Sequence, residues 1–527
     1  MGQIKYRIGK EEKMKNLRIL IFVICTTLFA IVATPILFAQ QISSLVVEHE
    51  QHWDTYMVGG TCVFATQNIH LADLDADGTI EIITGGYTYN MENETRVQAS
   101  APLKIWNWNG QNLTLETSYK WPANQDSAAI VCVTSGDVNA DGKINLLTGG
   151  RMANQSGFYT QLRMWRWDGN ELRLLTSKEW NTTQGTSGIS GTVIIDADND
   201  GKLEIFTSGR NFYSETNSTN AELRVWQLNN SELNLLKSIE WRSGNTSSAN
   251  SITATDLNKD GKIEVVTAGY SRELSNSSGQ ICIWQWNGTE FTLLANEEWQ
   301  TQQNIYALTS AGGVQGNTVV NNVKVGDIDG DGATEIVTGG FTYNGEKVNG
   351  QLRIWNLTGQ TIMLEANQEW TTEYITEVKS ITLNDVDKDG NIEIVTSGVT
   401  AGQTSFTENT TSEIAQLRVW SWNGSKIVLE QSADWTIGEG VCAWNVASDD
   451  IDKDGTVEII TVGCMYVSNL CDPDMRIWSI NQQSSPIPTE IAEHAVALQM
   501  ELFVAGGISL TVIVAATFYL LKKRTRK

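Results

Sequence analysis

The chain alternates short apolar segments with polar turns over most of its length, and this alternation itself repeats. Segments such as IEIITGG from Ile80 and LRIWNL from Leu352 have the alternating, β-branched character of strands. Equivalent segments recur in the same order every 58 to 71 residues. A period of this length is typical of proteins in which each repeat forms one supersecondary unit. The pattern therefore predicts an all-β repeat fold.

Each repeat contains three motifs that occur seven times. The first is an acidic loop, DxDxDG or a close variant, followed by an apolar segment ending in Gly. The second is a strand such as LRMWRWDG from Leu162, and the third is an apolar alternation that ends in Trp. One repeat thus predicts four antiparallel strands, the composition of a propeller blade. The closing tryptophans are Trp53, Trp121, Trp180, Trp241, Trp299, Trp370 and Trp435.

The two ends of the repeat array complement each other. A lone strand ending at Trp53 precedes the first acidic loop, whereas the last repeat stops at Trp478 without its fourth strand. Pairing of the N-terminal strand with the last repeat would protect an edge that is otherwise exposed. We therefore predict a seven-bladed β-propeller over residues 41–482, with four-stranded blades and a ring closed by the N-terminal strand.

The acidic loops have the composition of calcium sites. Oxygen side chains occupy positions 1, 3, 5 and 9, and Gly at position 6 permits a sharp turn, as Gly78 does in the first loop. Position 12 is Thr, where an EF-hand has a bidentate Glu, so these are predicted as calcium-binding β-hairpins. Metal-free Asp-rich turns are the alternative. The predicted ligands of up to seven structural Ca²⁺ ions are Asp73, Asp75, Asp77, Glu81, Asp137, Asn139, Asp141, Asn145, Asp196, Asp198, Asp200, Glu204, Asp256, Asn258, Asp260, Glu264, Asp327, Asp329, Asp331, Glu335, Asp385, Asp387, Asp389, Glu393, Asp450, Asp452, Asp454 and Glu458.

These loops, followed by segments such as EIVTGG, resemble the FG-GAP/VCBS repeat family, which includes the N-terminal propellers of integrin α subunits. The resemblance covers roughly residues 41–482. It implies calcium at one end of each blade and ligand binding at the opposite face. The chain departs from the family in lacking the Phe-Gly and Gly-Ala-Pro pair, and it has no inserted adhesion domain.

Segments outside the repeats predict a membrane-anchored protein. Residues 1–40 join a basic start to an apolar run, as in a signal peptide or an uncleaved signal anchor. Residues 501–521 predict a transmembrane helix after a linker, 483–500, and the basic residues 522–527 predict a cytoplasmic tail. The repeats would then lie outside a cell membrane crossed once, consistent with glycosylation sequons such as Asn93 and Asn423.

Composition limits the class of partner. Acidic residues outnumber basic ones by 61 to 37, for a net charge of −24, which disfavours nucleic acid because phosphates require basic surface. Seven cysteines in 527 residues are too few for a disulfide scaffold. Cys464 and Cys471 are close enough in sequence to pin one loop, while the other cysteines outside the signal segment fit buried thiols or pairs. Most tryptophans recur in phase, which favours packing between blades.

The sequence predicts recognition or adhesion, with an extracellular protein or a glycan as partner. None of the four histidines forms a recognisable catalytic arrangement, so no catalytic residue and no enzyme activity is predicted. An extracellular polysaccharide-acting enzyme, such as a calcium-dependent lyase, is the alternative, and a passive surface component is a third. The predicted ligand-binding residues, on the face opposite the acidic loops, are Tyr306, Tyr343, Tyr374, Trp444 and Tyr466.

Overall fold

The computed structural model describes residues 42–52, 61–92, 95–122, 127–154, 157–181, 185–273, 276–300, 318–344, 346–402, 413–467 and 470–483. Every regular element in these ranges is a β-strand, which confirms the predicted all-β class. The predicted segment 1–40, the span 501–521 and the tail 522–527 lie outside them. No helix that could cross a membrane is found among the described residues. The following description concerns the body formed by Leu45–Ile480.

The strands form antiparallel units of four, in agreement with the predicted repeat, and the fold is propeller-like. In chain order the strands are β1 (Ile42–His52), β2 (Thr61–Ala72), β3 (Glu81–Glu92), β4 (Thr95–Trp108), β5 (Leu113–Pro122), β6 (Ser127–Gly136), β7 (Asn145–Asn154), β8 (Gly157–Trp167), β9 (Leu172–Trp180), β10 (Gly185–Ile195), β11 (Glu204–Tyr213), β12 (Ser218–Asn229), β13 (Glu232–Trp241), β14 (Thr246–Thr255), β15 (Glu264–Glu273), β16 (Asn276–Trp286), β17 (Phe291–Trp299), β18 (Thr318–Gly326), β19 (Glu335–Tyr343), β20 (Val348–Thr358), β21 (Thr361–Trp370), β22 (Ile375–Asn384), β23 (Glu393–Ala401), β24 (Glu413–Trp422), β25 (Ile427–Trp435), β26 (Gly440–Asp449), β27 (Glu458–Val467) and β28 (Leu470–Gln483).

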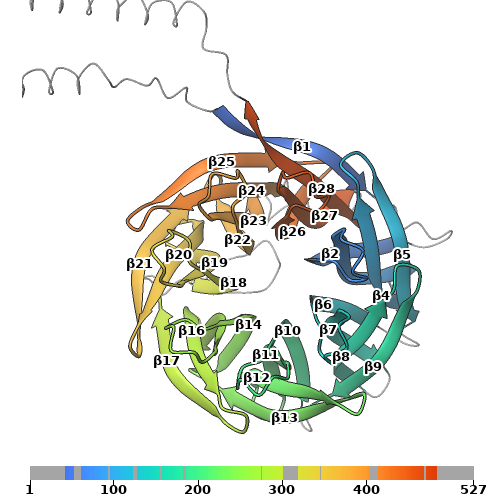
Figure 1. Ribbon diagram of the computed structural model, residues 1–527, viewed down its shortest axis with the longest axis vertical. Coiled ribbons are helices and arrows are strands. Elements are labelled where there is room, and N and C mark those ends of the chain that lie inside the picture. Colours follow the sequence, from blue (N-terminus) through green and yellow to red (C-terminus); the bar gives the residue numbers. More distant parts are fainter. Residues whose placement is uncertain are drawn as a thin grey trace, which may run out of the picture. The chain divides into compact units, whose positions relative to one another are not determined.

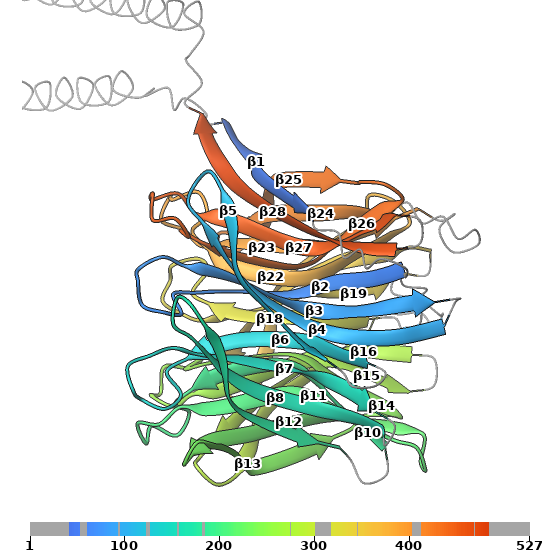
Figure 2. The ribbon, with the colours of Figure 1, turned by 90° about the vertical axis from the view of Figure 1, so that its right-hand side faces the viewer.

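The units lie around a common centre, with the first strand of each unit inside and the last outside (Figure 1). The units β2–β5 and β6–β9 are separate four-stranded sheets. Other units join into larger sheets through single parallel pairs, such as Glu413 with Gly440. Strand β1 pairs with β28, and the two strands lie side by side in both Figure 1 and Figure 2. The predicted supply of the missing strand by the N-terminal segment is therefore confirmed.

The innermost strand of each unit carries a β-bulge, which explains the last Gly of the repeated motif. In β18 the register shifts between Val320 and Asn322, opposite Gly340 of β19. A Cβ atom on Gly340 would lie 2.0 Å from the carbonyl oxygen of Val319. A bulge bends its strand and increases the local twist, and only glycine leaves room for the displaced carbonyl.

Burial falls from the centre outward. Strands β19 and β23 are buried along their whole length, whereas β9 is mostly exposed. This explains why the second strands are continuous apolar runs and the fourth strands are mixed. The core lies between neighbouring units: Val266 and Ile281 of one unit pack in a single cluster with Ile336 and Trp355 of the next.

Tryptophans form contacts between neighbouring units, as the sequence predicted. Trp299 at the end of β17 lies 4.6 Å from Trp355 of β20, measured between ring centroids, and its Nε1 donates to Oε1 of Gln351 at 3.0 Å. Offset or tilted aromatic pairs of this kind add stability beyond burial. The equivalent ring pairs are Trp180 with Trp226, Trp241 with Trp284, Trp370 with Trp420, and Trp435 with Trp478.

Threonine at position 12 of the motif has a structural partner that the sequence did not reveal. In every repeat its Oγ1 accepts a hydrogen bond from the Nε1 of the third-strand tryptophan, at 2.9 to 3.1 Å. Both groups are buried, so each indole N–H depends on this acceptor. The pairs are Trp106 with Thr84, Trp165 with Thr148, Trp226 with Thr207, Trp284 with Thr267, Trp355 with Thr338, Trp420 with Thr396, and Trp478 with Thr461.

Candidate metal centres

The acidic loops join the first and second strands of each unit, where the sequence placed them. Two positions in each loop have a left-handed backbone. At position 6 this residue is always Gly, as with Gly78 at a φ of 95°. Position 4 is also left-handed although its residue type varies, with Ala76 at 64° and Lys453 at 62°. Left-handed backbone disfavours residues with a Cβ by about 1 to 2 kcal/mol, so other interactions must hold the loop in shape.

Hydrogen bonds from the backbone to the carboxylates provide that support. In the first loop the N–H of Gly78 donates to Oδ2 of Asp73 at 3.1 Å, and the N–H of Asp77 donates to Oδ1 of Asp75 at 3.2 Å. The N–H of Leu74 donates to Oε2 of Glu81 at 2.7 Å. One oxygen of each of these carboxylates therefore fixes the backbone, and the second oxygen of Asp73 has no hydrogen-bond partner among the described residues.

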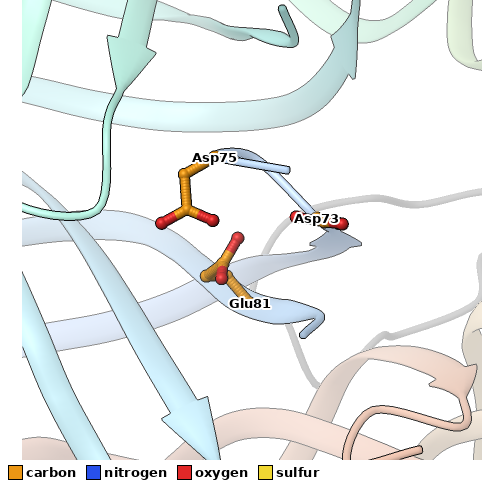
Figure 3. A group of neighbouring side chains, drawn as sticks. All are labelled: Asp73, Asp75 and Glu81. Carbon is orange, nitrogen blue, oxygen red and sulfur yellow. The ribbon is translucent and has the colours of Figure 1, made fainter. Parts of the chain in front are cut away.

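In five loops, three carboxylates converge. One oxygen from each of positions 1, 3 and 9 lies within 4.8 Å of the others, and the Glu of position 9 is buried. Figure 3 shows the first group, with the carboxylates of Asp75 and Glu81 facing each other and Asp73 beside them. The groups are Asp73, Asp75 and Glu81; Asp196, Asp198 and Glu204; Asp327, Asp329 and Glu335; Asp385, Asp387 and Glu393; and Asp450, Asp452 and Glu458. The position-5 carboxylates, such as Asp77, are not members of these groups.

Several of the converging oxygens are buried without a donor. Oδ1 of Asp73 has no hydrogen-bond partner among the described residues, and the same holds for Oδ1 of Asp327, Asp385 and Asp450. Burial raises the pKa of Glu81 to about 7, against the lowering effect of the Leu74 N–H, and the nearby Asp75 adds to the increase. A buried acceptor without a donor is costly, as are carboxylates held close together. The donor set, all oxygens on a tight loop, fits a hard divalent cation.

The remaining two loops do not form such a group. The second loop, from Asp137, has Asn139 and Asn145 at positions 3 and 9, and the fourth, from Asp256, has Asn258 at position 3. In the fourth loop Oε1 of Glu264 is buried and lacks a partner among the described residues. Predicted ligands in these two loops are therefore near one another in sequence but are not brought into a carboxylate triad.

In several units, the hairpin turn of the next unit packs closely against the acidic loop. Gly169 has a φ of 81°, and a Cβ there would lie 2.6 Å from Oδ2 of Asp75. Gly110 of the first unit approaches Asp452 of the last in the same way, again at 2.6 Å. Asn-Gly and Asp-Gly turns were predicted for their hairpin geometry. The structure adds a second reason for glycine there, the close approach of the neighbouring carboxylate.

The predicted ligand-binding residues do not form one described surface. Tyr306 and the side chain of Tyr466 lie outside the described residues. Tyr343 is buried, at 8% exposure, in a cluster against which Tyr374 packs. Trp444 is half-buried, and its Nε1 donates to Sγ of Cys464 at 3.3 Å.

A buried charged cluster beside Trp444 was missed in the sequence. Lys379 of β22 forms an ion pair with Glu377, and the side chains are 8% and 1% exposed. The Lys379 ammonium lies 4.7 Å from the Trp444 ring centroid. Burial raises the pKa of nearby Glu413 to about 7, although Lys379 opposes the increase. The available signal was two charged residues within an apolar first strand.

The question of cysteine pairing is partly answered. Cys132, Cys282, Cys442 and Cys464 are free and buried. Burial raises the pKa of the Cys132 thiol to about 12, so this thiol is neutral at ordinary pH. The loop-pinning pair of Cys464 with Cys471 is not formed, because Cys464 is a free thiol within β27.

Comparison with known proteins supports the repeat family. Residues 256–338 match the family model of the FG-GAP-like repeat. The match begins at Asp256, the first residue of the fourth acidic loop, and ends at Thr338, after the fifth. No curated protein matches the sequence.

Two solved structures are distantly similar to the chain. Sqt1 from Chaetomium thermophilum is 12% identical with a TM-score of 0.43, covering 83% of this chain and 100% of that one. The exotype rhamnogalacturonan lyase YesX is 12% identical with a TM-score of 0.41, covering 82% of this chain and 75% of that one. A lyase among the similar structures contradicts our expectation that the chain is not an enzyme, and we withdraw it. Likenesses this distant assign no activity to the chain.

The specific resemblance to integrin α propellers is not confirmed by these comparisons. What they support is the repeat itself, which the structure displays as an acidic loop between two strands. Residues 256–338 are thus similar to the FG-GAP-like repeat, and the comparisons support the repeat over that stretch.

Proposed function

We propose that the chain is a calcium-stabilised, seven-bladed propeller that acts in recognition at the cell surface. Closure of the ring is supported by contacts between the first and last units. Ile82 and Trp106 of the first unit pack in one cluster with Ile460 and Met475 of the last. In addition, the N–H of Ile80 donates to the carbonyl of Ile451 at 3.5 Å. Together with the pairing of β1 and β28, these contacts favour a closed ring over an open array.

Calcium is the proposed ion, and the partnerless buried oxygens are the observation that carries this proposal. Calcium takes six to eight oxygen ligands, including carboxylates and backbone carbonyls. It would compensate both the desolvated Asp oxygens and the burial and carboxylate crowding that raise the pKa of the position-9 glutamates. The residues of the five carboxylate triads would hold the ion, and its role would be structural because it neutralises charge inside a connecting loop.

Recognition is proposed for the opposite end of the units. The structure has a polar cavity of about 460 Å³ at that end of the third unit, lined by Tyr213, Asn220, Glu240, Trp241 and neighbouring residues. The Glu240 carboxylate accepts hydrogen bonds from the Tyr213 hydroxyl and from Nδ2 of Asn220, each at 2.8 Å. An aromatic ring beside fixed amide and carboxylate groups suits a glycan or a polar protein surface. The membrane-anchored, extracellular placement rests on the sequence pattern alone.

The metal proposal is tested by measuring bound calcium in the full chain, purified in a mild detergent, and by melting it with and without a chelator. We expect several calcium ions per chain and a large fall in melting temperature on chelation. A chain that binds no calcium and is indifferent to the chelator would refute the proposal.

Recognition is tested by applying the same preparation to glycan and extracellular-protein arrays. If the chain is retained on an array and Trp241→Ala abolishes this retention, binding at the third unit is supported. Trp180→Ala, at the equivalent position of the second unit, is the matched control and should leave retention unchanged. Release of cleavage products would reveal an enzyme acting on the retained glycan. No retention on either array would contradict a recognition role.

A further inference from the structure

The second acidic loop contains a cation supplied by the chain itself. Arg166 of β8 reaches Asp141 with both terminal nitrogens: Nη1 lies 2.8 Å from Oδ2 and Nη2 lies 3.2 Å from Oδ1. A guanidinium that contacts both carboxylate oxygens is the stronger and more directional form of this ion pair. Asn139 also donates from Nδ2 to Oδ2 of Asp141, at 3.0 Å. The Arg166 pair holds the pKa of Asp141 below its usual range.

Both carboxylate oxygens of Asp137 and both of Asp141 accept hydrogen bonds within the second loop or from Arg166. Asp137 accepts from the N–H of Asp141 through Oδ1, at 3.0 Å, and from the N–H of Gly142 through Oδ2, at 2.8 Å. In the first loop the corresponding Oδ1 of Asp73 is buried and lacks a partner among the described residues, whereas in the third loop both oxygens of Asp196 accept the same two backbone bonds as those of Asp137. The bonding of the position-1 aspartate therefore does not by itself separate the second loop from the triad loops. Position 9 is Asn145, which is fully buried and brings no charge, and neither Oδ1 nor Nδ2 of its amide has a partner among the described residues. The absence of carboxylates at positions 3 and 9 therefore distinguishes this loop from the triad loops, rather than the absence of unpaired oxygens.

The charge balance of the second loop also differs. It carries two carboxylates, Asp137 and Asp141, whereas the fifth loop carries four, at positions 1, 3, 5 and 9. One guanidinium leaves the second loop near neutrality, while the fifth requires a divalent ion for a comparable balance. An additional divalent cation beside Arg166 would meet a positive charge and only two carboxylates.

Arg166 is specific to this repeat. It follows the tryptophan whose Nε1 donates to the motif threonine, and the other repeats have a neutral residue there. These residues are Asn107, Gln227, Gln285, Asn356, Ser421 and Ser479. The arginine therefore occurs together with the loss of acidic residues at positions 3 and 9.

Another loop has a basic contact of a different kind. Lys202 lies 3.2 Å from Asp200 in the third loop, but its side chain is 66% exposed, whereas that of Arg166 is 19% exposed. An exposed lysine is easily displaced, and exposed pairs of this kind contribute little. The third loop also retains its carboxylate triad.

We propose that the second loop is metal-independent, because the Arg166 guanidinium, bound to the position-5 carboxylate, compensates the two remaining carboxylates in place of a divalent cation. This inference rests on the proposed calcium binding of those loops. It implies that one repeat of the array keeps its shape when calcium is removed, while its neighbours lose their ions.

The test compares Arg166→Gln with Glu335→Gln in the full chain, purified in a mild detergent. Glutamine is the natural residue at the Arg166 position in the third and fourth repeats. The Glu335→Gln change keeps an acceptor for the Ile328 N–H while removing the charge. Bound calcium is counted by native mass spectrometry, and melting temperature is measured with calcium and with chelator. A third variant, N139D/N145E/R166Q, converts the second loop into the triad type.

We expect Arg166→Gln to bind the same number of calcium ions as the unaltered chain and to melt lower by the same amount in both conditions. Glu335→Gln should bind one ion fewer and melt lower only with calcium, and the converted loop should bind one ion more. Loss of one ion in Arg166→Gln, a melting decrease confined to calcium, or no decrease at all would overturn the inference. If the converted variant does not fold, the two single variants decide.

Failure of the proposed function is recognised separately. The unaltered chain would then bind no calcium. The Glu335→Gln variant would melt at the same temperature as the unaltered chain, both with calcium and with chelator. Without calcium binding, the second loop would no longer differ from the others in its response to chelator.

Discussion

Thr338→Val tests whether the motif threonine supports the core through its hydroxyl. Thr338 and Trp355 are each 2% exposed, and the indole Nε1 donates to the hydroxyl at 2.9 Å. Valine matches threonine in shape but provides no acceptor. The indole N–H would then be buried without a partner, since water does not reach it.

The expected cost follows from that lost acceptor. A buried donor left unsatisfied costs about 1 to 3 kcal/mol. Trp355→Phe removes the donor instead and should itself destabilise by about 1 to 3 kcal/mol, because the smaller ring leaves a gap beside Trp299. In the Trp355→Phe background, Thr338→Val should cost little, so the coupling energy between the two positions should be about 1 kcal/mol or more.

Urea unfolding of the four chains, the unaltered protein, both single variants and the double variant, measures this coupling. Thr292→Val on the exposed part of β17 is the control, expected to change stability by less than about 0.5 kcal/mol. Strictly additive effects at Thr338 and Trp355 would refute the reasoning, since they would show that the hydrogen bond does not contribute.

Two further predictions concern buried charges. Glu413→Gln removes a carboxyl whose pKa is about 7 in the fold and 4.5 ordinarily. The folded protein keeps a proton that the unfolded chain releases between these values, so this group lowers the free energy of unfolding as pH rises from about 5 to 8, by up to about 3 kcal/mol. At saturating calcium, the variant's melting temperature should therefore fall less over this range; an unchanged pH profile would contradict the assignment. At the junction of β1 and β28, Asp474→Asn should lower the free energy of unfolding by about 3 kcal/mol, because it leaves the buried Arg476 with Glu50 as its one acidic partner among the described residues. Glu50→Gln changes a half-exposed partner of the same arginine and should lower the free energy of unfolding by less than about 1 kcal/mol. Equal losses in thermal unfolding would show that burial does not control these pairs.

Much of the fold could be predicted because each repeat carries the same local information. The acidic loop, the alternating third strand and the closing tryptophan each fix one part of the unit, and the complementary ends predicted the pairing of β1 with β28. The position of Gly340 opposite a bulge was not predictable in this way. Its reason is a carbonyl of the neighbouring strand, and a bulge leaves no mark in the periodicity of the strand that contains it.

The candidate metal centres were predicted by residue type and spacing, but their differences were not. Sequence spacing placed Asp137 and Asp141 in the same pattern as Asp73 and Asp77. What separates the two loops is Arg166, which lies 25 residues from Asp141 and reaches it only through the pairing of β7 and β8. Charges that approach through tertiary structure cannot be assigned from the loop alone.

The predicted ligand-binding residues were the least predictable part, because the sequence does not show which side chains are exposed. Tyr343 was predicted to lie on the face opposite the acidic loops and to contact a ligand, yet it is buried in an apolar cluster. Aromatic residues in loops are as able to pack inward as to bind a ligand. Lys379 and Glu377 were not selected, since charged residues in a strand are usually solvated, whereas here they neutralise each other inside the fold.

In the acidic loops, different groups determine the backbone conformation and the compensation of the carboxylate charge. In every repeat the N–H of the position-6 glycine donates to Oδ2 of the position-1 aspartate, at 2.8 to 3.1 Å. This bond is present in the second loop, where Arg166 supplies the cation, as well as in the triad loops. The backbone turn is therefore formed by the chain's own hydrogen bonds, and the cation compensates the carboxylates that the turn gathers. Because the two tasks are independent, a repeat can exchange a metal ion for a side-chain cation without changing its strands, and the array tolerates both kinds of loop in one fold.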